Sequence, residues 1–262
     1  MRREPSSIGD YFHVFNRGNR RMPIVYDESD RWRFLKVLRY FNDEYSVDNI
    51  FRCVDFEVKS GRCHNFERPK NWPPPRSLVK ILSYSLMPNH FHLLLKEIIN
   101  GGVSRFMKRF ADGFTKYINT KYDEVGSLFQ GPYKRTTIKS EKTLQYTDVY
   151  IQIFNIFELY PGGLEKAIKE FDKAFNFVLQ YQFCSLGESF GRKNLHIIDR
   201  DVLGETFRNL QEYKEFAREA ITFHDIRKMI NKEVEHVDIR NVDIRNVDIR
   251  RQHKERQHKE HN

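Results

Sequence analysis

The sequence lacks the features of membrane-spanning, secreted and disulfide-stabilised proteins. No run of about 18 apolar residues occurs in it, which excludes a transmembrane helix. The first ten residues are charged and no apolar stretch follows them, so we expect no secretory signal. The three cysteines, Cys53, Cys63 and Cys184, are an odd number without paired spacing, which argues against a disulfide scaffold. Together these absences predict a protein of the reducing cytoplasm.

Several motifs of common enzyme classes are also missing. The sequence contains no Walker phosphate-binding loop, no His-Glu-x-x-His and no Cys-x-x-Cys. Cys63 and His64 resemble half of a zinc site, but no second Cys/His pair stands at a workable spacing. A catalytic site must therefore be built from residues outside these motifs.

Positive charge is concentrated in the first part of the chain. Residues 1–140 hold 25 basic and 15 acidic side chains, a net charge of +10, whereas the full chain carries +9. A basic half of this kind indicates either a polyanion-binding surface or an ordinary solvated surface. Charge alone leaves both interpretations open.

The pattern of apolar residues predicts alternating strands and helices over residues 1–163. Prolines exclude regular structure from residues 68–77, which we expect to form a surface loop. Ser140 or Thr143 is the expected cap of the last helix of this part. Strands are expected at 11–15 and 51–58, as a pair or one bent strand within 80–96 and after a turn within 126–138, and helices at 27–40, 103–122 and 140–157.

The rest of the chain has a different pattern. Residues 164–183 and 201–231 show amphipathic helical periodicity and predict a small helical region over 164–232. Residues 233–262 repeat short units such as Asn-Val-Asp-Ile-Arg, whose five-residue period is too short for a solenoid. We therefore expect three parts: a domain of alternating strands and helices at 1–163, the helical region at 164–232, and a low-complexity tail at 233–262 that is disordered or loosely helical.

Two histidines separated by one residue form a candidate metal site. In a strand, His90 and His92 lie on the same face, and Phe91 points to the opposite one. Two neutral imidazoles on a rigid strand supply two ligands for a divalent metal, although a pair of ordinary strand-edge histidines has the same spacing. His13 also lies on an expected strand, as a core histidine or as a neighbour of this site.

A helix that follows this strand carries two candidate nucleophiles. Tyr146 and Tyr150 are four residues apart and share one helix face. A tyrosine presented by a helix can attack a phosphodiester and form a covalent phosphotyrosine. Packing of both rings between helix and sheet is the structural alternative.

The order of these motifs resembles that of the HUH single-tyrosine transposases, in particular their REP-associated branch. The shared features are an Asn-Arg-Gly turn, Met-Pro-Asn-His-x-His, Leu-Phe-Gln-Gly-x-Tyr-Lys and the tyrosine helix. They stand in YFHVFNRGNRR (11–21), SYSLMPNHFHLLLKE (83–97), SRFMKRFADGFTKYINTKYDEVGSLFQGPYK (104–134) and VYIQIFNIFELYPGG (149–163).

The resemblance implies an α+β fold, a ferredoxin-like antiparallel sheet with helices on one face, known as the HUH endonuclease fold. In such a protein His90 and His92 bind Mg²⁺ or Mn²⁺, which polarises the scissile phosphate of single-stranded DNA. Tyr150 matches the family's nucleophile, which forms a 5′-phosphotyrosine and releases a free 3′-OH. No nucleotide cofactor is needed because the ester bond energy is kept.

The resemblance also implies the partner and the residues that hold it. Asn16, Arg17 and Gly18 match the turn that helps hold the DNA, and Lys134 would lie near its phosphates. Relatives recognise a hairpin in single-stranded DNA, so stacking and backbone charge are the expected binding forces. The expected setting is the bacterial cytoplasm, at DNA of the nucleoid. Relatives include monomers and homodimers, and both remain open here.

Two departures from the family pattern concern the metal site. The family's third ligand stands four residues after the tyrosine, where this chain has Phe154, and Asn155 stands five residues after it. In a regular helix that step is about 140°, so Asn155 joins the metal only if the helix contains a π-bulge or ends early. Otherwise another residue or water completes the shell. The family's Pro and Arg are also replaced, by Ile156 and Pro132.

Three hypotheses follow. The leading one is a metal-dependent DNA nickase and strand transferase, a transposase that serves DNA transposition and recombination. The second is a domesticated, non-catalytic protein that binds the hairpin or single-stranded DNA. The third is a metal-dependent hydrolase of an unrelated fold, which would need further ligands that the remaining histidines do not supply in any motif.

Overall fold

The computed structural model describes residues 6–45, 50–51 and 66–221. Within them the first part of the chain alternates strands and helices in the order βαββαβ, in agreement with the expected pattern. These elements are β1 (Tyr11–Arg17), α1 (Glu28–Phe41), β2 (Val79–Leu86), β3 (His90–Glu97), α3 (Gly102–Tyr122) and β4 (Lys134–Ile138). The expected strand at 51–58 lies outside the described residues except for Phe51, which is helical.

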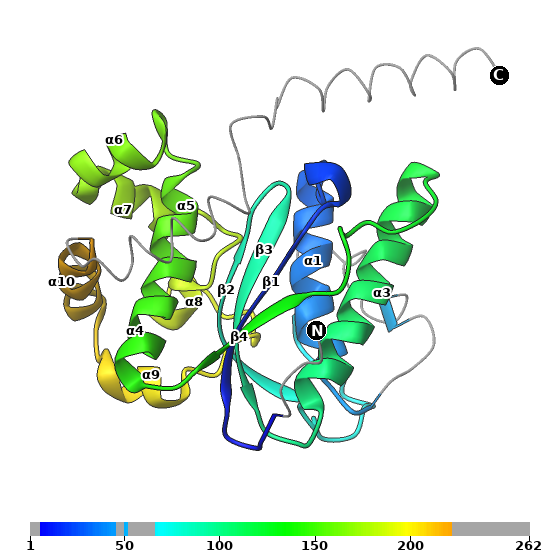
Figure 1. Ribbon diagram of the computed structural model, residues 1–262. Helices are drawn as coiled ribbons and strands as arrows, with labels where there is room; N and C mark the ends of the chain where they lie inside the picture. The colour runs from blue at the N-terminus through cyan, green and yellow to red at the C-terminus, as the bar shows by residue number, and fades with distance from the viewer. Residues whose placement is uncertain (1–5, 46–49, 52–65, 222–262) are drawn as a thin grey trace, which may run out of the picture.

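The four strands form one antiparallel sheet in the order β2-β3-β1-β4 (Figure 1). This order, with a helix after β1 and another after β3, is the ferredoxin-like topology. The expected α+β fold is therefore confirmed. The register places Phe15 beside His92 and Arg17 beside His90, so the end of β1 lies next to the histidine pair.

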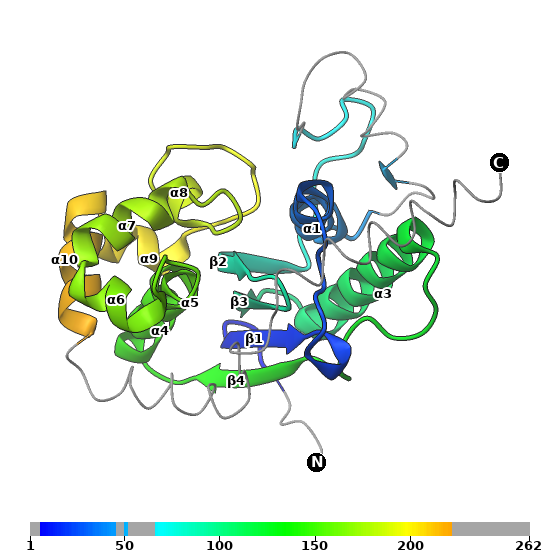
Figure 2. The same ribbon diagram turned by 90° about the horizontal axis from the view of Figure 1, so that it is seen from above.

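Helices cover both faces of the sheet, and the expectation of helices on one face is wrong. Figure 2 shows α1 and α3 on one side of the strands and α4 with the C-terminal helices on the other. The reason is visible on β3, where Phe91 and Leu93 join the core under α1 and α3 while Leu94 joins the core under α4. Because both faces of this strand are buried, each needs its own cover.

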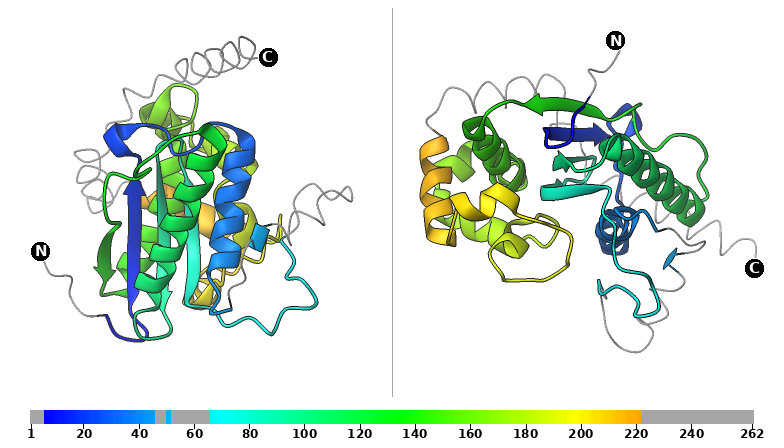
Figure 3. Two further views of the ribbon diagram at one scale, coloured as in Figure 1. Left: turned by 90° about the vertical axis from the view of Figure 1, so that its right-hand side faces the viewer. Right: turned by 90° about the horizontal axis from the view of Figure 1, so that it is seen from below.

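The core under α1 and α3 is held by aromatic side chains. Phe34 of α1 meets Phe110 and Phe114 of α3 edge to face, with ring centroids 5.0 and 5.3 Å apart. The apolar stripe predicted for residues 103–122 is buried along its whole length, so this helix faces the core as expected. The left view of Figure 3 shows α1 and α3 side by side in front of the sheet.

The second face is covered by one helix of three segments and by shorter C-terminal helices. Ser140 caps the first segment, its Oγ accepting from the backbone N–H of Thr143. The segments are α4 (Glu141–Val149), the π-helix η2 (Tyr150–Phe154) and α5 (Asn155–Phe157). The C-terminal helices are α6 (Gly163–Lys169), α7 (Phe171–Gln180), α8 (Leu186–Ser189), α9 (Asp201–Thr206) and α10 (Leu210–Ala220).

Both long helical patterns of the C-terminal part are broken in the structure. The expected helix at 164–183 divides at Glu170, whose backbone leaves the helical region. The expected helix at 201–231 divides at Phe207, which is extended, and Asn209 then caps α10 through Glu212. Amphipathic periodicity continues across both breaks because each piece packs on the same core.

One hydrophobic core joins α4, η2 and the C-terminal helices. It contains Ile153 and Phe157 from one side and Phe175, Val178 and Ala217 from the other. The proposed tail at 233–262 and the pair of Cys63 and His64 lie outside the described residues. No helix in the described part of the chain has the length and hydrophobicity that crossing a bilayer requires.

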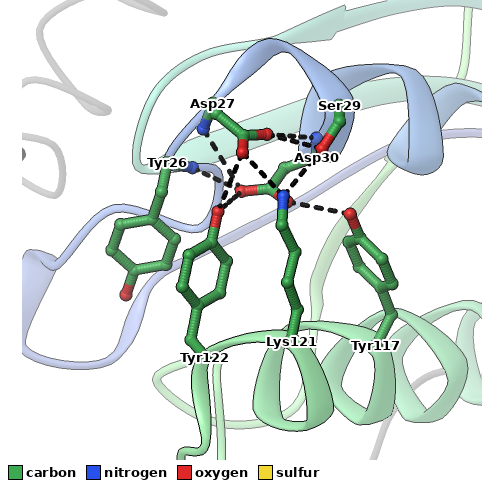
Figure 4. Close-up of polar contacts among 7 residues, drawn as sticks. All are labelled: Tyr26, Asp27, Ser29, Asp30, Tyr117, Lys121 and Tyr122. Atoms are coloured by element: carbon green, nitrogen blue, oxygen red, sulfur yellow. Dashed lines mark hydrogen bonds and ion pairs between the residues drawn. The ribbon is translucent and has the colours of Figure 1, made fainter. Parts of the chain in front are cut away.

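A buried carboxylate ties the start of α1 to the end of α3. Asp30 is fully buried and accepts hydrogen bonds from the hydroxyls of Tyr117 (3.0 Å) and Tyr122 (2.7 Å) and from Nζ of Lys121 (2.7 Å). It also completes a capping box with Asp27 at the helix start. Figure 4 shows the three side chains of α3 converging on the two aspartates.

We expect Asp30→Ala to lower the free energy of unfolding by about 3 kcal/mol, because it removes a fully buried acceptor that receives hydrogen bonds from three side chains of α3. The measurement is urea denaturation of both proteins. The control is Asp112→Ala, which removes an exposed ion pair with Lys108 on the same helix and should cost less than about 0.5 kcal/mol. Equal effects of the two variants would contradict a structural role for the buried network.

Candidate functional site

The two predicted metal-binding histidines lie side by side on β3. His90 and His92 are 3% and 1% exposed, and their ring centroids are 5.1 Å apart with the ring planes at 89°. Both side chains point to the face of the sheet that α4 and η2 cover, because residues two apart in a strand share a face.

The protonation of His90 follows from its neighbour. Nδ1 of His90 lies 2.7 Å from Oδ1 of Asn89, and the Asn89 amide nitrogen donates to the carbonyl of Arg21. Since an amide oxygen only accepts, Nδ1 of His90 carries the proton and Nε2 keeps its lone pair. Burial, and then the charge of Arg17, lowers the pKa of His90 to about 3. The ring is therefore a neutral imidazole at physiological pH, as a metal ligand must be.

A third histidine supports the pair from β1. Nε2 of His13 lies 2.9 Å from Nδ1 of His92, and the two rings stack at 5.1 Å. Burial lowers the pKa of His13 to about 3 and, together with the neighbouring histidines, that of His92 well below its usual value. Both rings are neutral, so one nitrogen donates and the other accepts. His13 is thus both a core histidine and a neighbour of the site.

Tyr150 packs against these histidines. Its ring centroid lies 5.7 Å from that of His92 and 5.9 Å from that of His13, edge to face in both cases. Tyr146 instead stacks on Phe216 of α10 at 5.4 Å. The structure therefore separates the two candidate nucleophiles, and Tyr150 is the one beside the histidine pair. Tyr150 is 4% exposed.

The helix contains a π-turn at the position where the sequence required one. The backbone N–H of Asn155 donates to the carbonyl of Tyr150, five residues earlier. This extra residue rotates Asn155 back toward the face of Tyr150. The Asn155 amide nitrogen lies 3.3 Å from Oγ of Ser85, whose Cα pairs with that of His92 in the sheet. Asn155 thus lies on the same side of the sheet as the histidines.

The donor set available for a metal consists of imidazole and amide groups. Among the described residues, no group of three or more His, Cys, Asp or Glu side chains is arranged to hold an ion. His90 and His92 supply two neutral nitrogen ligands, and Asn155 is the amide that the π-turn brings to their side of the sheet. Such a set suits a divalent ion that keeps water in its shell.

A cleft of about 250 Å³ opens next to the histidine pair. Its lining residues are Phe15, Asn16, Arg17, His90, His92, Gln130, Gly131, Pro132 and Lys134. Five predicted DNA-binding or metal-binding positions therefore meet at one cleft: Asn16, Arg17 and Lys134 with the two histidines. Tyr150 and Asn155 do not line this cleft. The Tyr150 ring packs against that of His92, and Asn155 contacts Ser85, which pairs with His92 in the sheet.

Arg17 is a candidate anion-binding group of the cleft. Its Nε donates to Oε1 of Gln130. Its Nη1 is buried and has no hydrogen-bond partner among the described residues. A buried guanidinium nitrogen without a partner is costly unless a ligand completes it, and phosphate is a good match for this geometry.

The predicted DNA-holding turn is fastened to the loop before β4. Asn16 donates through its amide to the carbonyl of Gly131 (2.9 Å), and the Gln130 N–H donates to the carbonyl of Arg17 (2.9 Å). Gly18 does not line the cleft; a Cβ there would lie 1.9 Å from the carbonyl oxygen of Met22. Gly18 is required by the close packing of the turn, which in turn holds Arg17 in place.

Three residues of the site were not among those predicted from the sequence. Phe15 stacks on His92 with ring centroids 5.6 Å apart, and Gln130 and Asn89 hold Arg17 and His90. Strand alternation offered a signal for Phe15, which stands midway between His13 and Arg17 on β1. Gln130 and Asn89 lie inside motifs already quoted, but only their contacts reveal what they do.

Comparison with known proteins bears on the same part of the chain. Residues 75–153 match the family model described as "Transposase IS200 like", a range that runs from before β2 to the π-turn. This segment is similar to that of IS200-like transposases. The matching segment contains His90, His92, Lys134 and Tyr150, and it excludes β1 with Arg17 and all the C-terminal helices.

Solved structures give a more distant likeness. Seven solved chains match. One is described as "Structure of the REP associates tyrosine transposase bound to a REP hairpin"; it has a TM-score of 0.41 and 16% sequence identity, over 76% of this chain and 93% of that one. No protein in the curated set matches.

Proposed function

We propose that this protein is a transposase that cleaves and joins single-stranded DNA near a hairpin through a 5′-phosphotyrosine intermediate. The observation that carries the proposal is the contact of Tyr150 with His92 and His13, inside the segment that matches IS200-like transposases. A helix tyrosine packed against neutral histidines beside a basic cleft fits phosphodiester transesterification better than any other chemistry of the described residues.

His90 and His92 would hold Mg²⁺ or Mn²⁺, with Asn155 as the third protein ligand. The bound ion would polarise the scissile phosphate. Asn89 keeps the lone pair of His90 on Nε2, and His13 fixes the orientation of the His92 ring. The buried, neutral state of these rings supports metal binding over ion pairing.

Tyr150 would act as the nucleophile. The phenol gives up its proton, its oxygen bonds to phosphorus, and the bond between phosphorus and the 3′ oxygen breaks to leave a 3′-OH. The new phosphotyrosine ester keeps the energy of the cleaved bond, so the reverse attack by a 3′-OH rejoins DNA without a nucleotide cofactor. Because Tyr150 is 4% exposed, substrate binding must give the phosphate access to its hydroxyl.

The cleft would hold the DNA backbone and one base. Arg17 and Lys134 supply positive charge, and Nη1 of Arg17 is available for a phosphate oxygen. Phe15 lines the cleft against His92 and offers a stacking surface. The net charge of +10 over residues 1–140 supports a polyanionic partner.

A covalent-adduct assay tests the proposal. The protein is incubated with Mn²⁺ and hairpin oligonucleotides from the DNA flanking its own gene that carry the label at the 3′ end, and then run on a denaturing gel. We expect label to remain on the protein only when the metal is present. The low exposure of Tyr150 favours a second candidate function, a protein that binds the hairpin without cleaving it. This candidate predicts a gel shift and no adduct. Absence of both binding and adduct would overturn the proposed partner.

A further inference from the structure

A buried polar cluster lies on the side of the π-turn that faces away from the histidines. Gln152, in the middle of the turn, is 2% exposed. Its amide nitrogen donates to both carboxylate oxygens of Asp148 (3.0 and 2.9 Å) and to the hydroxyl of Tyr213 in α10 (3.1 Å). Its amide oxygen accepts from the hydroxyls of Ser185 (2.8 Å) and Ser189 (3.2 Å).

The cluster connects the π-turn to three other parts of the molecule. Ser189 belongs to α8, and Tyr213 belongs to α10. Ser185 also accepts from the backbone N–H of Tyr84, which fixes it against β2. Gln152 therefore links the turn to the C-terminal helices and to the edge of the sheet at once.

The same contacts exclude another role for Ser189. Gly187-Glu188-Ser189-Phe190-Gly191 matches the Gly-x-Ser-x-Gly pattern of serine hydrolases. However, Ser189 ends the four-residue helix α8 rather than a strand-to-helix turn, and its hydroxyl donates to Gln152. The hydroxyl contributes to holding the turn, and the pattern is coincidental.

A π-turn needs tertiary support because it is less stable than a regular helical turn. Without it, the five-residue step from Tyr150 would revert to the α-helical one, and Asn155 would rotate away from the histidine face by roughly 100°. Gln152 holds the turn through both its amide nitrogen and its amide oxygen. Because the cluster is buried, each of its hydrogen bonds is costly to lose.

We propose that Gln152 is a positioning residue, and that the C-terminal helices supply Ser189 and Tyr213, with Ser185 from the loop before α8, to keep the π-turn in register. The C-terminal helices then align Tyr150 and Asn155 with the histidine pair. This inference rests on the proposed function for its effect on cleavage, whereas the support of the turn is independent of it.

Gln152→Met tests the inference, since Met has a similar volume and removes all five hydrogen bonds. Amide hydrogen exchange over residues 150–157 should rise at least 10-fold. The rate of adduct formation at saturating DNA and Mn²⁺ should fall at least 10-fold, while hairpin affinity stays within twofold. Mn²⁺ binding to the free protein, measured by calorimetry, should weaken in the same variant.

Two controls separate positioning from general stability. Gln145→Met changes a glutamine of α4 that bonds only to Glu141 among the described residues and should leave both measurements unchanged. Val37→Ala creates a cavity in the opposite core and should lower the melting temperature without changing the exchange of 150–157 or the adduct rate at saturation. If Gln152→Met does not fold, Tyr213→Phe and Ser189→Ala each remove one of the hydrogen bonds of Gln152 and should give smaller changes in the same direction.

The outcomes are distinguishable. The inference would be overturned if amide hydrogen exchange and the adduct rate stayed within twofold of the parent in Gln152→Met. The same result in both Tyr213→Phe and Ser189→Ala would also overturn it. A parent protein that forms no adduct would overturn the proposed function, and exchange together with Mn²⁺ binding would still decide whether Gln152 holds the turn and its ligand.

Discussion

Replacement of Tyr150 by Phe should abolish covalent attachment to DNA, with a fall of at least about 1,000-fold in the rate of cleavage. The variant removes one oxygen, and the ring keeps its edge contacts with His92 and His13. Fold and hairpin affinity should therefore be unchanged. The measurement is the denaturing-gel adduct assay, paired with a gel shift on the same oligonucleotide.

The matched control is Tyr146→Phe, one regular helical turn earlier. Tyr146 stacks on Phe216 and belongs to the side of α4 that faces the C-terminal helices. Its hydroxyl should be dispensable, and adduct yield should stay within twofold of the parent. Adduct formation that persists in Tyr150→Phe and disappears in Tyr146→Phe would move the nucleophile to Tyr146 and contradict the arrangement described above.

The second large effect concerns the metal. We expect His90→Ala to reduce Mn²⁺-dependent cleavage at least about 100-fold, because the variant removes one of the two imidazoles proposed to bind the ion and leaves Oδ1 of Asn89 without its partner. Calorimetric titration with Mn²⁺ should show weaker binding in parallel. Hairpin binding without metal should remain within about threefold, since the variant leaves in place Arg17 and Lys134, the residues proposed to hold the DNA backbone.

His196→Ala is the control, because this histidine is exposed and lies in the loop between α8 and α9. It should change neither Mn²⁺ affinity nor cleavage. Equal Mn²⁺ binding by the parent and His90→Ala would show that the ion, if required, binds elsewhere, and the role of the β3 pair would then be structural.

Local patterns were sufficient for the four strands of the sheet, for the first two helices and for the start of the third, whereas the strand expected at 51–58 lies outside the described residues except for the helical Phe51. The proline loop and the stripe of residues 103–122 each depend on neighbours close in sequence, and both are confirmed. Residues 80–96 form a pair of strands and not one bent strand. The placement of His90 and His92 on one face follows from the two-residue period of a strand. These features need no knowledge of the rest of the fold.

The C-terminal helices show where local patterns stop being informative. Periodicity predicted two long helices, but Glu170 and Phe207 interrupt them, and the pieces pack around α4. Helices on both faces of the sheet were missed for a related reason. A strand that is buried on both faces appears in the sequence as a continuous run of apolar residues. Such a run does not show which helix covers which face.

What the sequence determined by itself is the set of chemical groups and their local spacing: two histidines on a strand, a tyrosine on a helix, and a basic first half of the chain. It also stated a condition, that Asn155 faces the site only if the helix contains a π-bulge or ends early. The tertiary structure decided that condition. The π-turn exists because Gln152 finds its partners in Asp148, Ser185, Ser189 and Tyr213. Three of these partners stand 33 to 61 residues away along the chain, and a helix register that depends on such distant contacts cannot be read from local periodicity.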